Sequence, residues 1–207
     1  RRLFVCDRGG LGRLFPDVST TAPAASTFLD LPALLKSRNE SLSTSSEQGL
    51  LGIVFHPDYS ANRYFYIFYS VKISGTVYER VSRFTTQEEN PALADSGSEL
   101  VLLQQLDEAD NHNGGDLHFG PDGYLYISLG DEGDQSDAGN NSQRINKDFF
   151  AGLLRIDVDK KPGNLEPNAN PNPAAAGLGL DSANAIPRDE IPAGSGHFFA
   201  RYSIPLD

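Results

Sequence analysis

The sequence has few of the features that mark several large functional classes. It carries 17 basic residues against 28 acidic ones, a formal charge of -11, and no run of lysines or arginines. We therefore expect neither a nucleic acid nor an anionic membrane surface as a partner. No apolar stretch approaches the roughly 20 residues that cross a bilayer. Serine-nucleophile, zinc, Walker and Rossmann signatures are also absent.

Cysteine and methionine are equally scarce. Cys6 is the single cysteine, so no internal disulfide can form, and its place in the apolar run "RLFVC" favours a buried thiol. Cysteine usage leaves the cellular compartment open. The chain has no methionine and enters a strand-like segment at once. We therefore interpret it as starting inside a fold. Either a signal peptide has been removed or upstream residues are missing, and the sequence leaves both open.

Most of the sequence predicts β-structure. Short runs of β-formers alternate with turns rich in Gly, Pro, Asn and Asp, such as "HPDYSANR" and "GPDG". One short helix is expected around Pro32 to Lys36. The proline-rich segment 160–189 predicts a long surface excursion within one domain over 1–207, because strand-like "GHFFARYSI" follows it. The predicted strands are Leu3–Cys6, Arg13–Phe15, Leu50–Phe55, Tyr64–Val71, Arg80–Thr85, Leu100–Leu106, Asp116–Phe119, Tyr124–Leu129 and Leu153–Val158.

Two segments repeat one pattern. "FHPDYSANRYFYIFYS" from Phe55 and "FGPDGYLYISLGD" from Phe119 share Phe-x-Pro-Asp, a turn and an aromatic-rich strand. Each predicts a strand, a tight turn and an antiparallel return. The copies are further apart than the roughly 40 to 50 residues of a propeller blade, so insertions must separate them. Repeated sheet units with long loops indicate an all-β propeller, with a sandwich as the alternative.

Three motifs, taken in order, carry a resemblance to a known family. "EQGLLGIVFHPDYSANRYFYIFYS", "NHNGGDLHFGPDGYLYISLGD" and "GLLRIDVD" resemble the quinoprotein glucose/sorbosone dehydrogenases, whose fold also appears in hedgehog-interacting proteins. The resemblance runs from about Arg2 to Asp159 and returns at "IPLD". It implies a six-bladed propeller of four-stranded antiparallel blades, of which this chain holds roughly the N-terminal half. Missing sequence or another chain would complete the ring, because half a ring exposes sheet edges.

The resemblance also implies a site. His112 would remove the proton of a sugar hydroxyl while hydride passes to pyrroloquinoline quinone, and a neutral imidazole suits that role. Glycines behind it would let the backbone approach a flat ligand. A polar residue before the Gly-Leu-Leu-Gly strand is also expected to reach this region, and the register leaves two choices open. The implied cofactor-binding residues are Asn111, Gly114, Gly115, Asp131 and either Glu47 or Gln48.

Two departures bear on that expectation. Asp116 stands where the family commonly has an arginine, and it could repel an anionic cofactor unless it points away or is paired. The family's cofactor-clamping arginine and calcium-binding loop lie beyond an I-P-x-D segment, which the residues "IPLD" ending at Asp207 resemble, so calcium ligands are expected downstream. We interpret the acidic residues from Asp131 to Asp137 as a solvated loop and assign no metal ligand. "NES" at Asn39 and "NNS" at Asn140 fit the N-glycosylation pattern, which is common by chance.

Two functions follow as alternatives. The first is a periplasmic or secreted dehydrogenase that oxidises an aldose or related sugar alcohol and passes electrons to an external acceptor. The second is a non-catalytic propeller, similar to hedgehog-interacting proteins, that binds a protein or glycan through its loops. Asn111 and His112 with the paired glycines favour the first, and Asp116 favours the second.

Overall fold

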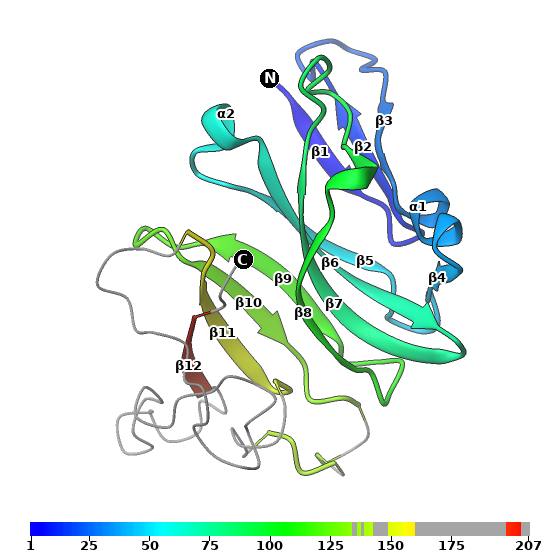
Figure 1. The fold of residues 1–207 in the computed structure, drawn as a ribbon, viewed down its shortest axis with the longest axis vertical. Coiled ribbons are helices and arrows are strands. Elements are labelled where there is room, and N and C mark those ends of the chain that lie inside the picture. Colours follow the sequence, from blue (N-terminus) through cyan, green and yellow to red (C-terminus); the bar gives the residue numbers. More distant parts are fainter. Residues whose placement is uncertain (134–135, 138, 143–148, 160–197, 204–207) are drawn as a thin grey trace. The chain divides into compact units, whose positions relative to one another are not determined.

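The computed structural model describes residues 1–133, 136–137, 139–142, 149–159 and 198–203 (Figure 1). The chain divides into two compact units, Arg1–Glu108 and Ala109–Asp207, and each is described by itself. Both units are built from β-sheets with few helices, as the sequence predicts. The excursion expected at 160–189 lies outside the described residues.

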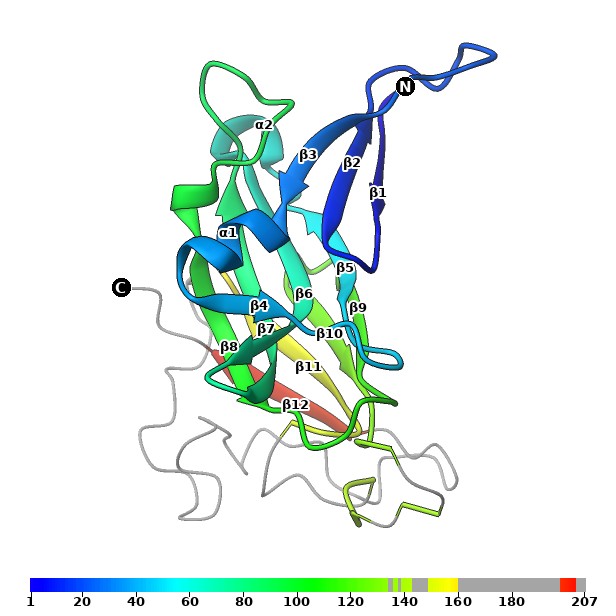
Figure 2. The same ribbon diagram turned by 90° about the vertical axis from the view of Figure 1, so that its right-hand side faces the viewer.

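The first unit begins with a three-stranded antiparallel sheet of β1 (Leu3–Cys6), β2 (Leu11–Phe15) and β3 (Ser26–Asp30). The predicted helix follows as α1 (Leu31–Ser37), which starts there because the Asp30 side chain accepts a hydrogen bond from the Ala33 N–H at 2.9 Å. Figure 2 shows α1 beside β4. β3 is a strand that the sequence did not predict.

A larger sheet completes this unit. It contains β4 (Glu40–Leu42), β5 (Leu50–Phe55), β6 (Tyr64–Ile73), β7 (Thr76–Thr85) and β8 (Leu100–Leu106), with the short helices α2 (Tyr59–Asn62) and η1 (Ser96–Ser98) between strands. β6 pairs antiparallel with β7 over ten residues each. Its residues from Phe65 to Val71 are all buried, so the aromatic run packs on both faces of the sheet as predicted.

Buried aromatic rings form the core of the first unit. Phe28 from β3, Phe65 from β6 and Phe84 from β7 are each 2% exposed or less, and the Phe65 and Phe84 rings stack at 5.5 Å. Cys6 lies partly buried at the margin of this cluster, and burial raises the pKa of its thiol to about 12. The thiol therefore stays protonated at neutral pH, which agrees with the buried interpretation.

A buried network of charged groups lies in the same unit. The Arg80 guanidinium, on β7, is bonded to Glu40 at 3.1 Å, to Gln104 at 2.8 Å and to the Tyr69 hydroxyl at 3.2 Å. Tyr69 also donates to Glu99 at 2.5 Å. Burial, with the charge of Glu99 beside it, raises the pKa of Tyr69. These bonds tie β4, β6, β7 and β8 to one another.

The described residues of the second unit contain one sheet in the order β12, β11, β10, β9. Its strands are β9 (Gly114–Phe119), β10 (Leu125–Leu129), β11 (Gly152–Asp157) and β12 (Phe198–Ser203). The first three are antiparallel in chain order, while β12 runs parallel to β11 and departs in this from the implied blade. The "GPDG" turn closes with a 2.9 Å bond from the Gly123 N–H to the Gly120 carbonyl. Among the described residues, no helix is both long and apolar enough to cross a membrane.

Candidate active site

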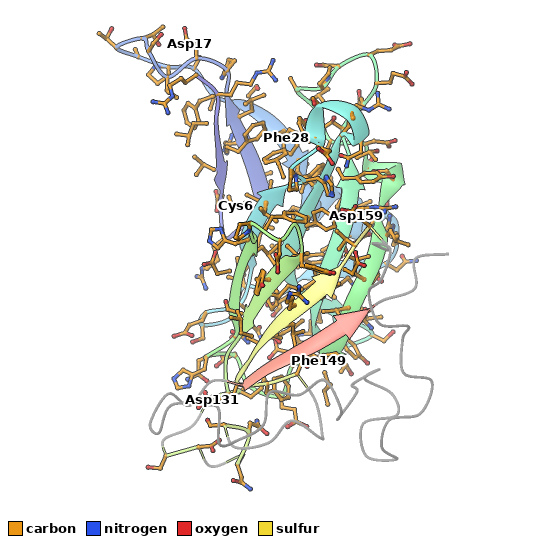
Figure 3. The ribbon with its side chains drawn as sticks, turned by 90° about the vertical axis from the view of Figure 1, so that its left-hand side faces the viewer. Cys6, Asp17, Phe28, Asp131, Phe149 and Asp159 are labelled. Carbon is orange, nitrogen blue, oxygen red and sulfur yellow. The ribbon has the colours of Figure 1, made fainter. Side chains whose placement is uncertain are left out.

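His112 and Asp131 form the centre of the candidate site, in the second unit. His112 precedes β9 and Asp131 follows β10, and the antiparallel pairing of these strands brings the start of one to the end of the other. The Nδ1 atom of His112 lies 2.8 Å from Oδ1 of Asp131. Asp131 is labelled in Figure 3, at the end of this sheet. The His112 side chain is 48% exposed, so solvent or a ligand can reach it.

Backbone packing fixes the position of His112. Its φ of 58° lies in the left-handed region, which histidine adopts more readily than most residues. A Cβ on Gly130, between β10 and Asp131, would overlap the carbonyl oxygen of His112. Gly130 is therefore needed for the histidine to sit there, a role that the sequence prediction missed although "LGD" was visible as a strand end.

The contact with Asp131 decides which imidazole nitrogen can act as a base. A carboxylate oxygen at 2.8 Å from Nδ1 accepts its N–H, which leaves the lone pair of the neutral ring on Nε2. The carboxylate also stabilises the imidazolium that forms when Nε2 takes a proton. The pair is thus suited to proton abstraction.

Asn111 and the two glycines lie next to this pair. A Cβ on Gly133 would overlap Oδ1 of Asn111, so the Asn111 amide lies against the loop after β10. Gly114 has φ 81°, and a Cβ there would come within 2.8 Å of backbone atoms of Leu129 and Gly130. The close packing of β9 on β10 thus explains why residue 114 is a glycine, whether or not a ligand binds there. Gly115 is buried, with φ 105°.

Glu47 and Gln48 belong to the first unit and are described there alone. The Gln48 side chain is buried, accepts a bond from the Ser43 hydroxyl at 2.5 Å and donates one to Asp107 at 2.9 Å. Glu47 is exposed. The Arg8 guanidinium donates to the carbonyls of Ser46 and, at 3.3 Å, Gln48, and so braces this loop. An internal network therefore engages the Gln48 amide, whereas the Glu47 carboxylate lies at the surface.

Asp116 lies on the exposed face of β9. Its neighbours in sequence, Gly115 and Leu117, are buried on the other face. Oδ2 of Asp116 is 3.2 Å from Nε2 of His118, which shares the exposed face. The carboxylate therefore has a partner, His118, that can carry a compensating charge. A paired carboxylate need not repel an anionic ligand.

Carboxylates of the acidic loop after β10 accept hydrogen bonds from backbone N–H groups. The Glu132 carboxylate accepts the Ala109 N–H at 2.8 Å, and Asp137 accepts the Asn141 N–H at 2.7 Å. In the part of the chain that the structure describes, no three His, Cys, Asp or Glu side chains gather closely enough to hold a metal ion.

The chain shares sequence with both kinds of protein that the motifs suggested. Hedgehog-interacting protein of Mus musculus is 31% identical over 187 residues, which cover 83% of this chain and 25% of that protein. Quinoprotein glucose dehydrogenase B of Acinetobacter calcoaceticus is 31% identical over 93 residues, 42% of this chain and 19% of that protein. The chain thus spans about a quarter or less of these relatives.

Solved structures show the same fold. The aldose sugar dehydrogenase of Streptomyces coelicolor, in its PQQ-bound form, matches with a TM-score of 0.59 and 25% identity, over 80% of this chain and 45% of that one. The soluble aldose sugar dehydrogenase of Escherichia coli matches with a TM-score of 0.57 at 21% identity, over 74% of this chain and 40% of its own, which shows the fold alone. These structures are β-propellers, and the chain is part of one.

The match to the family is extensive. A family model described as Glucose / Sorbosone dehydrogenase covers residues 20–176, which include β3 to β11 and the whole of the site around His112. The three motifs, the propeller sheets and this match lead to one conclusion: the chain belongs to the glucose/sorbosone dehydrogenase family.

Proposed function

We propose that the complete protein is a quinoprotein dehydrogenase that oxidises an aldose or a related sugar alcohol. The observation that carries this proposal is the His112 imidazole, half exposed and bonded through Nδ1 to Asp131 at 2.8 Å. A base held in one tautomer at an accessible position is what removal of a hydroxyl proton requires.

In this proposal the chain's own residues handle the proton. Nε2 of His112 takes the proton of the sugar hydroxyl, and Asp131 balances the positive charge that develops on the ring. The carbon that bears this hydroxyl gives up a hydride, and its C–OH bond becomes C=O. Pyrroloquinoline quinone, when bound, supplies the two-electron acceptor that no side chain can provide.

The donor set fits this cofactor in part. Asn111, Gly114, Gly115 and Asp131 would lie along it. None of these residues carries a positive charge, whereas the quinone carries carboxylates that need one. In this proposal calcium and basic groups from the rest of the propeller supply that charge, and those groups come from further sequence or from another chain. The substrate and the external electron acceptor would meet the protein in the periplasm or outside the cell.

A non-catalytic propeller is the second candidate. It is favoured by the relative that covers 83% of this chain, a hedgehog-interacting protein, against 42% for the glucose dehydrogenase. Asp116 in place of the family's arginine points the same way. In that case the loops around Asn111 and Asp131 would contact a protein or glycan partner.

One experiment separates the two. The complete protein is mixed with the quinone and calcium, and dye reduction is measured with several aldoses for the original protein, His112→Ala and His118→Ala. His118 is a matched control, because it is an exposed histidine on β9 bonded to Asp116 rather than to Asp131. We expect activity that His112→Ala lowers by about a hundredfold or more and that His118→Ala leaves nearly unchanged. Absence of both quinone binding and activity would favour the non-catalytic candidate.

A further inference from the structure

The loop after β10 turns back onto Asp131 and holds it at two places. Asn141 is 2% exposed, and its Nδ2 donates to the Asp131 carbonyl at 3.0 Å. The hydroxyl of Ser142 donates to Oδ2 of Asp131 at 3.3 Å. Two consecutive residues thus bind the main chain and the side chain of the same aspartate.

Asp137 keeps these two residues in place. Its Oδ1 accepts the Asn141 N–H at 2.7 Å and the Ser142 N–H at 3.2 Å. The Asn140 N–H closes a turn onto the Asp137 carbonyl at 2.7 Å. The Asn141 and Ser142 backbone is therefore fixed within the loop itself, before either side chain reaches Asp131.

The two oxygens of Asp131 then have separate partners. Oδ1 faces Nδ1 of His112 at 2.8 Å, and Oδ2 faces the Ser142 hydroxyl. The terminal torsion of an aspartate is broad and roughly two-fold, so a carboxylate with one partner can rotate. A second donor on the opposite oxygen restricts that rotation and keeps Oδ1 on the imidazole.

We propose that Ser142 is a positioning residue for His112, acting through Asp131, with Asn141 anchoring the aspartate backbone. The effect of Ser142 on catalysis rests on the proposed dehydrogenase function, whereas its positioning of His112 does not. The "NNS" segment, which fits a glycosylation pattern, has by these contacts a structural role inside the site.

The test reads the imidazole directly. The complete protein is labelled with ¹⁵N-histidine, and the nitrogen shifts of His112, assigned with His112→Gln, give its tautomer without substrate or cofactor. We expect the Nδ1–H tautomer in the original protein and a mixture in Ser142→Ala. Ser142→Thr, which keeps the hydroxyl, should restore the original spectrum. Ser136→Ala, an exposed serine in the same loop, is the control and should change nothing.

Kinetics then separate the two proposals. If the protein oxidises sugars, Ser142→Ala should lower kcat by about tenfold and leave KM within about twofold, because it alters the base and not the sugar contacts. A tautomer that shifts in Ser142→Ala, in a protein with no activity, supports the positioning role and counts against the dehydrogenase. A His112 tautomer that is the same in Ser142→Ala as in the original protein overturns the positioning role.

Discussion

Asp116 and His118 lie side by side on the exposed face of β9, with Oδ2 of one 3.2 Å from Nε2 of the other. Both side chains are about three-quarters exposed, so water screens their charges. Asp116, which stands where the family commonly has an arginine, is therefore paired with His118, and its charge acts only weakly on a ligand at the site.

We predict that Asp116→Asn changes quinone affinity and sugar oxidation by less than about threefold. Removing one exposed, paired charge leaves the bond between His112 and Asp131 intact. Quinone titration followed by fluorescence, together with dye reduction, measures both quantities. A gain of tenfold or more in affinity would mean that the carboxylate does repel the cofactor.

Gly130→Ala should destabilise the second unit by about 3 kcal/mol or more. The new methyl group would overlap the backbone carbonyl of His112, which cannot move aside as the end of a flexible side chain could. The matched control is Gly75→Ala, at the turn between β6 and β7, where φ is 92° and no atom lies within 4 Å of the added carbon. That change should cost only about 1 kcal/mol of conformational strain. Urea unfolding of each variant gives the comparison, and equal losses would contradict the overlap.

Arg80→Met should lower the free energy of unfolding by about 3 to 5 kcal/mol. The substitution leaves Glu40, whose side chain is 16% exposed, without its cation, and removes a bond to Tyr69. Arg80→Met combined with Glu40→Gln should recover part of the loss, because no uncompensated carboxylate remains. Denaturant titrations of the two single variants and the double variant test this coupling, and strictly additive losses would exclude it.

The Asp122 carboxylate should stabilise the fold by an amount that falls at acid pH. Partial burial opposes ionisation, but bonds from the Tyr124 N–H, the Tyr126 hydroxyl and Arg155 outweigh it and lower the pKa of this carboxyl below its ordinary 3.8. Because the folded-state pKa is the lower one, the stabilisation is present above 3.8 and is lost as pH falls through the folded value.

The measurement compares the original protein with Asp122→Asn by denaturant titration between about pH 6 and pH 2. The difference in unfolding free energy should be constant at the upper end and shrink below about pH 4. A difference that stays constant down to the lowest pH would show that the carboxylate is not ionised preferentially in the folded state. Arg155, whose guanidinium lies 3.6 Å from the Tyr124 ring centroid, would remain stacked in the variant.

Local pattern predicted most of the strands of the first unit but missed β3 and β4. β6, with its unbroken aromatic run, was predicted, whereas β3 reads "STFLD" and β4 reads "ESL", too short and too polar to stand out. β7 begins at Thr76 and not at Arg80, because the turn at Ser74 and Gly75 returns the chain directly along β6. Pairing with a neighbour decided these boundaries, and pairing is not a local property.

The residues of the candidate site could be predicted from the sequence only in part. His112 and Asp131 could be named from motifs, but their contact depends on the register of β9 against β10, which shifts between Ile127 and Leu129. In the sequence, Ser142 stood out only as the last residue of "NNS", which fits an N-glycosylation pattern. Asp116 raised a question about charge that only its partner, His118, could answer.

The left-handed backbone of His112 has a consequence for ligand binding. An isolated chain seldom places histidine at a φ of 58°, and such conformations cost about 1 to 3 kcal/mol unless the surrounding structure imposes them. Here folding imposes it through the close approach of Gly130. The imidazole is therefore preorganised, so a ligand that meets it does not have to order it, and more of the ligand's contact energy remains as affinity.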